Sequence, residues 1–187
     1  MPLYSRMSTI YDRQLLQEDR QRTVVGITVT TSGSTSTVSG EPAIFHWHLY
    51  LVLGPSTAPT AEVPGVISQS VLIDMIPVNP PTGCMVITSK RQPRSESNVK
   101  AELEIATTGS PTVQQIIDLF KSKGMDRYNF DDTGSGCLWW LWTGLEYLEQ
   151  AHLVETGATE KLRRFHSEQV ALHPERHLVP MRQGKFY

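Results

Sequence analysis

Hydrophobic residues form five β-prone runs in the first part of the chain. The run TVVGITVT, residues 23 to 30, is rich in β-branched residues. The longest run, AIFHWHLYLVL at 43 to 53, is apolar at almost every position, which predicts a central strand buried on both faces. The runs at 70 to 77 and 83 to 90 predict an antiparallel meander, and the alternating run at 99 to 108 predicts a half-exposed strand.

The period of the pattern changes from two to about 3.6 residues after these runs. Apolar residues three and four apart predict an amphipathic helix over 110 to 124, with Ser110 as its cap and Pro111 at its first position. The segment 137 to 153 predicts the most apolar helix of the chain, and a third helix is expected to begin near Thr156.

Polar segments flank this pattern and define the expected domain organisation. Residues 1 to 22 are predicted to form a polar N-terminal arm, residues 23 to 172 one domain, and residues 173 to 187 a polar C-terminal tail. We expect an α+β fold in which an antiparallel sheet of about five strands packs against two or three helices.

Composition narrows the classes of partner. The chain has 187 residues, 39% hydrophobic residues and a formal net charge of −2, so it offers no broad basic surface for nucleic acid. It contains no apolar run of about 18 residues and no apolar signal segment near its start, from which we expect no membrane partner and a cytoplasmic protein.

The two cysteines stand in different contexts. They form no disulfide framework and no zinc-site spacing, so each thiol needs its own explanation. Cys137 opens the predicted apolar helix and follows Gly134 and Gly136, a place where free backbone N–H groups and the helix dipole favour a thiolate and an oxyanion. Small core filler is the alternative interpretation of Cys137 and the expected role of Cys84.

Two histidines and one carboxylate are candidate partners for the thiol. His46 and His48 share one face of the central strand, and Asp74 is the lone carboxylate of an apolar strand. His46 would be the base and Asp74 its orienting group. The alternatives are core histidines bonded to backbone, an Asp74 paired with arginine, and a metal bound by both histidines with Asp74 as third ligand. We expect neither metal nor cofactor.

These motifs carry a resemblance to a known group. The chain reads HWHLY, then IDMIP, then GC, in the order strand, strand, helix. In this it resembles the permuted papain-like proteins, which include the lecithin retinol acyltransferase family, the NlpC/P60 superfamily and the PPPDE peptidases. The resemblance implies that His46 is the base, that Asp74 replaces the family's second histidine, and that Cys137 is the nucleophile. Gly136 stands where the family usually has asparagine, and Tyr128 in RYNF resembles the tyrosine that precedes the family's cysteine.

The resulting prediction is a thiol-dependent acyl transferase or an amide or ester hydrolase that acts on a small molecule or peptide. The residues expected to contact the substrate are Tyr128, His48, Trp47, Trp140 and Gly136. The chain also looks like a set of uncharacterised fungal proteins, and one alternative is a non-hydrolytic or cyclase-type binding protein of fungal secondary metabolism. A second alternative is an interaction module that buries its tryptophan-rich surface against a partner or in a homodimer.

Overall fold

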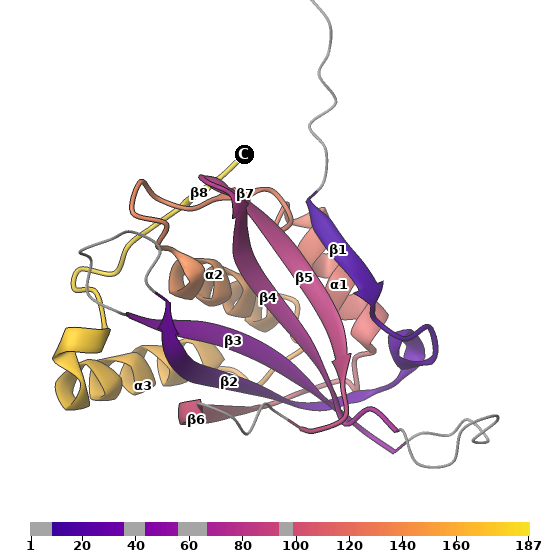
Figure 1. Cartoon of the computed structure of the whole chain (residues 1–187). Helices are drawn as coiled ribbons and strands as arrows, with labels where there is room; N and C mark the ends of the chain where they lie inside the picture. Colours follow the sequence, from indigo (N-terminus) through magenta and orange to yellow (C-terminus); the bar gives the residue numbers. More distant parts are fainter. Residues whose placement is uncertain (1–8, 36–43, 56–66, 94–98) are drawn as a thin grey trace, which may run out of the picture.

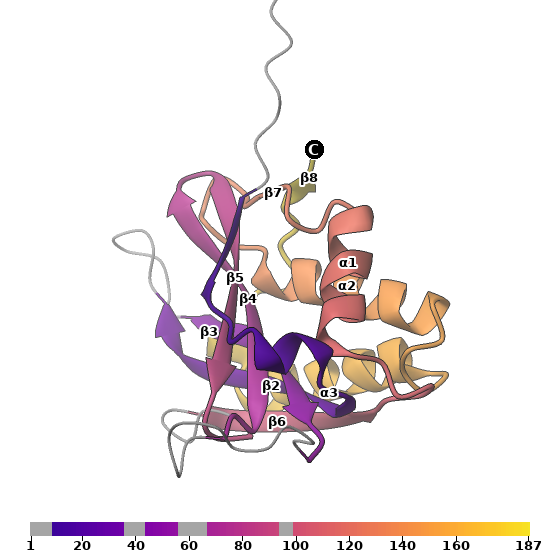
Figure 2. The ribbon, with the colours of Figure 1, turned by 90° about the vertical axis from the view of Figure 1, so that its right-hand side faces the viewer.

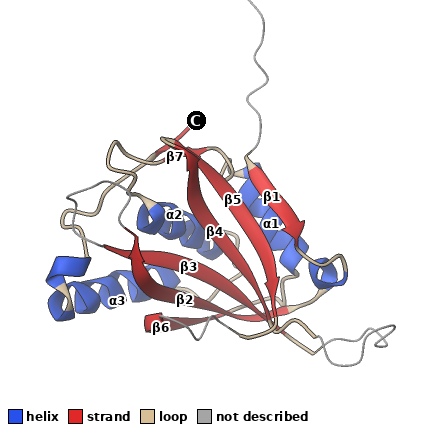
Figure 3. Ribbon diagram, in the orientation of Figure 1, coloured by secondary structure: helices blue, strands red, loops and turns tan. Residues whose placement is uncertain are grey.

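The computed structural model describes residues 9–35, 44–55, 67–93 and 99–187. Within these residues the chain forms one strongly twisted sheet of eight strands and three α-helices. Figure 1 shows the sheet in front of the helices, and Figure 2, turned by 90°, shows the helices gathered on one side of it. The α+β class predicted from the sequence is confirmed, and Figure 3 separates its two kinds of element by colour.

The sheet has more strands than predicted. Its order is β6-β2-β3-β4-β5-β7-β8, and β1 pairs with β5 beside this path. All pairings are antiparallel except that of β1 with β5. The strands are β1 (Ile10–Gln14), β2 (Val24–Thr35), β3 (Ile44–Leu53), β4 (Ser70–Asn79), β5 (Thr82–Lys90), β6 (Val99–Ala106), β7 (Tyr128–Asn129) and β8 (Lys185–Phe186).

The three strands beyond the predicted five come from polar segments. β1 lies in the predicted N-terminal arm, β7 in the loop before the cysteine helix, and β8 in the predicted C-terminal tail. Each has two to five residues, too few to show the alternating pattern from which a strand is recognised. The arm and the tail therefore take part in the sheet where the structure describes them, since β1 pairs with β5 and β8 with β7.

β3 and β4 separate from each other before either strand ends. They pair only from Leu49 to Val52 in β3 and from Ser70 to Ile73 in β4. Beyond that point the first half of β3 stays paired with β2, and the second half of β4 stays paired with β5. The sheet thus forks, and Figure 1 shows a helix, α2, lying behind the opening.

The helices are α1 (Val113–Ser122), α2 (Cys137–Gln150) and α3 (Ala158–Leu172), with 3-10 turns at Glu18–Gln21 and Pro174–Arg176. Thr112 caps α1, in a capping box with Gln115, so the predicted cap at Ser110 and first helical position at Pro111 are wrong. The helix starts two residues later because only Thr112 combines extended backbone with a side chain that reaches Gln115 N–H.

The core lies between the sheet and the helices. Alternate residues of the central strands, such as Leu49, Ile73 and Ile87, face α2, whose buried side includes Leu141 and Leu145. The intervening residues face the opposite side of the sheet, and several of them are polar. In the part of the chain that the structure describes, no helix is long and apolar enough to cross a membrane.

Candidate active site

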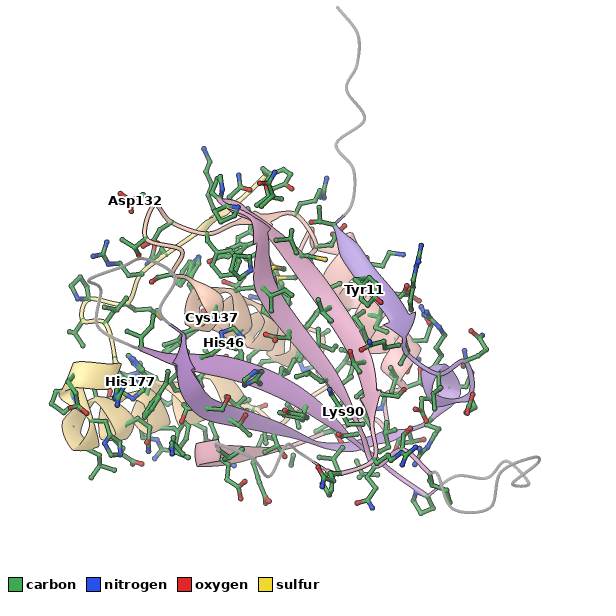
Figure 4. The ribbon with its side chains drawn as sticks, viewed as in Figure 1. Tyr11, His46, Lys90, Asp132, Cys137 and His177 are labelled. Carbon is green, nitrogen blue, oxygen red and sulfur yellow. The ribbon has the colours of Figure 1, made fainter. Side chains whose placement is uncertain are left out.

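Cys137, His46 and Asp74 meet at the fork in the sheet. His46 belongs to the part of β3 that has left β4, and Asp74 is the first residue of β4 beyond the paired segment. Cys137 is the first residue of α2, the helix behind the opening. Figure 4 shows Cys137 and His46 next to each other at the start of that helix. The fork therefore lets side chains from the polar side of the sheet reach the end of a helix on its other side.

His46 interacts with both of its predicted partners. Its Nε2 lies 2.7 Å from Asp74 Oδ1, and the Cys137 side chain is close enough to its ring to raise the pKa of His46. An imidazole has two ring nitrogens. Because Nε2 is hydrogen-bonded to Asp74, Nδ1 is the nitrogen left to interact with the thiol. The order thiol, imidazole, carboxylate is that of a nucleophile, a general base and a group that orients the base.

The electrostatics of the pair favour a charged imidazole. Burial of the His46 ring opposes protonation, but its electrostatic interactions with Cys137 and Asp74 outweigh burial and raise the pKa of His46 well above its ordinary 6.5. Burial likewise opposes ionisation of Asp74, yet the charge and hydrogen bond of His46 lower the pKa of its carboxyl below 3.8. Both shifts point to an ionised Asp74 beside a protonated His46.

His48 has a different environment from its neighbour on the same face. Burial, and then the positive charge of His46, lower its pKa to about 4, so His48 is neutral at pH 7. Its Nδ1 lies 3.1 Å from Ser32 Oγ, and its Nε2 lies 3.8 Å from Asp74 Oδ2. His48 thus packs beside the carboxylate as a neutral ring and does not contact the helix end in the way His46 does.

Gly136 sets the backbone conformation just before Cys137, and a residue with a side chain at this position would force neighbouring atoms to move. Gly136 has φ 134°, and an added Cβ would lie 2.5 Å from the Tyr128 hydroxyl oxygen. That hydroxyl donates to the Gly136 carbonyl at 2.8 Å and accepts from Gly184 N–H at 3.0 Å. Tyr128 is fully buried, so its place is beneath the start of α2, where it fixes the position of Cys137.

The other predicted contact residues divide into two groups. Trp47 and Gly136 line a pocket that also includes Cys137. Trp140 is 2% exposed and donates from Nε1 to the Met125 carbonyl at 2.7 Å, so it is part of the core and away from that pocket. Cys84, expected to be structural filler, is a half-buried free thiol on β5.

A metal ion is the alternative use of the polar residues at the fork. His46, His48 and Asp74 each offer one ligand atom, and these atoms lie within 4.8 Å of one another. Two histidines and one carboxylate suit zinc or iron chemistry. A metal would compete with the 2.7 Å hydrogen bond that His46 and Asp74 already form.

Sequence analysis did not identify several polar residues near the site. Ser32 reaches His48 from β2, where it pairs with His46 in the strand register, but serine in a β-branched run carries no distinguishing signal. His177, Arg176 and Arg182 come from the predicted tail and line the same pocket as Cys137. Their proximity depends on how the tail folds back over α3 and β3, which no local pattern encodes.

The fold and site define an α+β protein with a cysteine, a histidine and an aspartate joined at the start of a helix. The family described as a domain of unknown function, DUF7770, matches residues 25–187, which include all three of these residues and the C-terminal segment. The chain belongs to this family. No curated protein and no solved structure matches it.

Proposed function

We propose that the protein is a thiol-dependent acyl transferase or an amide or ester hydrolase, with Cys137 as nucleophile, His46 as base and Asp74 as the group that orients His46. The observation that carries the proposal is that His46 bonds Asp74 Oδ1 at 2.7 Å and interacts at the same time with the side chain of Cys137. The resemblance to permuted papain-like proteins agrees with it, because the strand, strand, helix order places a histidine and a cysteine in the same roles, with Asp74 where the family has a second histidine.

The position of the thiol supports nucleophilic chemistry. The first N–H groups of an α-helix have no acceptor within the helix, and the helix dipole places positive potential at the same end. Both features stabilise negative charge on Cys137 Sγ and on an acyl oxygen bound beside it. Trp140 N–H already bonds the Gly136 carbonyl, so the donors available to an oxyanion belong to the residues before Trp140.

The proposed reaction has two steps. The thiolate of Cys137 attacks the acyl carbon and forms a C–S bond, while the leaving group departs with the proton that His46 supplies. Water, or another nucleophile, then gives its proton to His46 and attacks the thioester carbon, which breaks the C–S bond and restores the thiolate. Asp74 keeps the His46 ring oriented and stabilises its positive charge in both steps.

A covalent labelling experiment tests this proposal. The wild-type chain is mixed with p-nitrophenyl acetate, and the acetylated residue is located by intact-mass and peptide mass spectrometry. We expect transient acetylation of Cys137 and none of Cys84, with release of one p-nitrophenolate per acetyl group. Cys137→Ala should abolish the label, and His46→Ala should slow it by about 10²- to 10⁴-fold, since general-base catalysis contributes on that order.

Equal acetylation of both cysteines, or no acetylation of Cys137, would contradict the proposal. In that case the alternative with the better support is a binding protein that keeps the pocket beside Cys137 without its thiol chemistry. Unlabelled Cys137 in a chain that still binds a small molecule would identify this alternative.

A further inference from the structure

Three side chains with metal-binding atoms converge at the fork in the sheet. His46 and His48 project from the same face of β3, with ring centroids 4.5 Å apart and ring planes at 85°. Asp74 faces them from β4, and each of its carboxylate oxygens lies near one ring nitrogen. Oδ1 is 2.7 Å from His46 Nε2, and Oδ2 is 3.8 Å from His48 Nε2. In the described part of the chain, no other three His, Cys, Asp or Glu side chains are placed to hold a metal ion together.

The distances suit a tetrahedral zinc ion. Zinc binds nitrogen and oxygen at about 2.0 to 2.2 Å, so two ligand atoms of a tetrahedral ion lie roughly 3.4 Å apart. The 3.8 Å between His48 Nε2 and Asp74 Oδ2 is within roughly 0.4 Å of that spacing, and the 2.7 Å between His46 Nε2 and Oδ1 has to widen by roughly 0.7 Å. Small rotations of these side chains are enough for both adjustments.

His48 is held in the orientation of a metal ligand, although the proposed reaction does not use it. Its Nδ1 lies 3.1 Å from Ser32 Oγ, and its Nε2 faces Asp74 across a gap longer than a hydrogen bond. A hydrogen bond at the second ring nitrogen is typical of metal-binding histidines, because it fixes the direction of the ring. The nitrogen that faces the carboxylate is therefore positioned to share an ion with it.

The donor set and its exposure define the class of ion. Two imidazoles and one carboxylate favour a divalent transition metal such as zinc over calcium and magnesium, which bind mainly through oxygen. The side chains of His46, His48 and Asp74 are 13%, 17% and 11% exposed, so an ion can reach them from solvent. Three protein ligands leave the fourth position of a zinc ion for water.

We propose that His46, His48 and Asp74 bind one divalent transition-metal ion, zinc by preference, and that the bound ion inhibits the thiol site. The inhibition rests on the proposed function, whereas the metal site does not. A metal on His46 Nε2 occupies the lone pair of that nitrogen, so the single proton of the neutral ring sits on Nδ1. Nδ1 then has no lone pair with which to accept a proton from Cys137 or from water, and Asp74 no longer orients the ring.

Calorimetric titration of zinc chloride into Cys137→Ala tests the site without the neighbouring thiol. We expect one zinc ion per chain, with the affinity reduced at least about tenfold by His48→Gln or Asp74→Asn and about tenfold by Ser32→Ala, which removes only the bond that orients His48. His173→Gln, on an exposed histidine at the end of α3, should leave the affinity unchanged. The absence of zinc binding, or affinities that are the same in His48→Gln, Ser32→Ala and His173→Gln, would overturn the metal site.

Acetylation of wild-type Cys137 by p-nitrophenyl acetate, at increasing zinc concentration, tests the inhibition. The rate should fall to that of His46→Ala, recover fully when EDTA removes the metal, and need at least about tenfold more zinc for half-inhibition in His48→Gln. An undiminished rate at saturating zinc, or a half-inhibiting concentration unaffected by His48→Gln, would overturn the inhibitory role. A Cys137 that is not acetylated even without zinc would contradict the proposed function and the inhibition together, while the calorimetry would still decide whether the metal site exists.

Discussion

His46 Nε2 and Asp74 Oδ1 lie 2.7 Å apart although their strands no longer pair where these residues stand. In a continuous sheet, backbone hydrogen bonds would hold β3 and β4 together at this point. Here a side-chain ion pair joins them in place of the backbone, and the opening admits the start of α2. The pair therefore positions the His46 ring and bridges the two halves of the sheet.

Asp74→Asn tests the charge in this pair. Asparagine keeps the size of the side chain and one oxygen acceptor, but it removes the negative charge that raises the pKa of His46. We expect the pKa of His46 to fall toward its ordinary value, as measured by NMR titration of its ring. Ester hydrolysis should drop by up to about 10⁴-fold, the loss found when the orienting carboxylate of a triad is neutralised.

The matched control for this change is Asp118→Asn, which neutralises an exposed carboxylate on α1. It should alter neither the titration of His46 nor the rate. If Asp74→Asn left both unchanged as well, Asp74 would be a structural residue and the proposed role would be wrong.

The pH dependence of stability follows from His48. Its pKa is about 4 in the folded chain and about 6.5 in the unfolded chain, so between these values only the unfolded chain binds the proton. The contribution of His48 to the free energy of unfolding is therefore complete above pH 6.5 and is lost as the pH falls toward 4. Urea unfolding should show a free energy of unfolding that declines in this window, by roughly 2 to 3 kcal/mol for this one group.

His177 has the same shift and should contribute a similar decline. In His48→Gln the decline between pH 6.5 and 4 should be smaller than in the wild type. The additional change His177→Phe should reduce it further. An unchanged slope in the double variant would mean that other groups cause the loss of stability in acid.

Gly136→Ala is expected to destabilise the chain more than a positive φ alone would. The new Cβ would have to move the Tyr128 hydroxyl, 2.5 Å away, in addition to adopting φ 134°. Gly109→Ala is the control, because Gly109 also has a positive φ, 67°, and an added Cβ would meet nothing within 4 Å. Thermal unfolding should show a loss of about 1 kcal/mol for the control and clearly more for Gly136→Ala. Equal losses would exclude a steric role for Tyr128.

Tyr128→Phe removes the hydroxyl that links Gly136 and Gly184. The Gly136 carbonyl would lose a buried donor, so we expect a loss of about 1 to 3 kcal/mol of stability and slower ester hydrolysis through displacement of the start of α2. Tyr11→Phe changes an exposed side chain and is the control. It should alter the free energy of unfolding by no more than about 0.5 kcal/mol and leave the rate of ester hydrolysis unchanged within experimental error. A stable Tyr128→Phe variant with normal kinetics would show that the hydroxyl is dispensable.

Local patterns were sufficient to predict the main strands, the three helices and the face shared by His46 and His48. Residue periodicity and the β-branched content of runs such as 43–53 carry that information directly. The fork between β3 and β4 could not be predicted in this way, because it depends on the twist that two halves of a sheet accumulate around α2. The proximity of His46, Asp74 and Cys137 was implied only by the resemblance to permuted papain-like proteins. The pocket lined by His177 and Arg182 was not expected, since the tail reaches it only through tertiary packing.

The most direct test of the Cys137, His46 and Asp74 unit is the rate of iodoacetamide alkylation of each cysteine against pH, followed by mass spectrometry in the wild type and in His46→Ala. Cys84 is an internal reference, because burial raises the pKa of its thiol. If Cys137 forms an ion pair with His46, it should react faster than Cys84 below pH 7 and lose this advantage in His46→Ala. A Cys137 that reacts no faster than Cys84, or that reacts equally well without His46, would contradict the proposed catalytic unit.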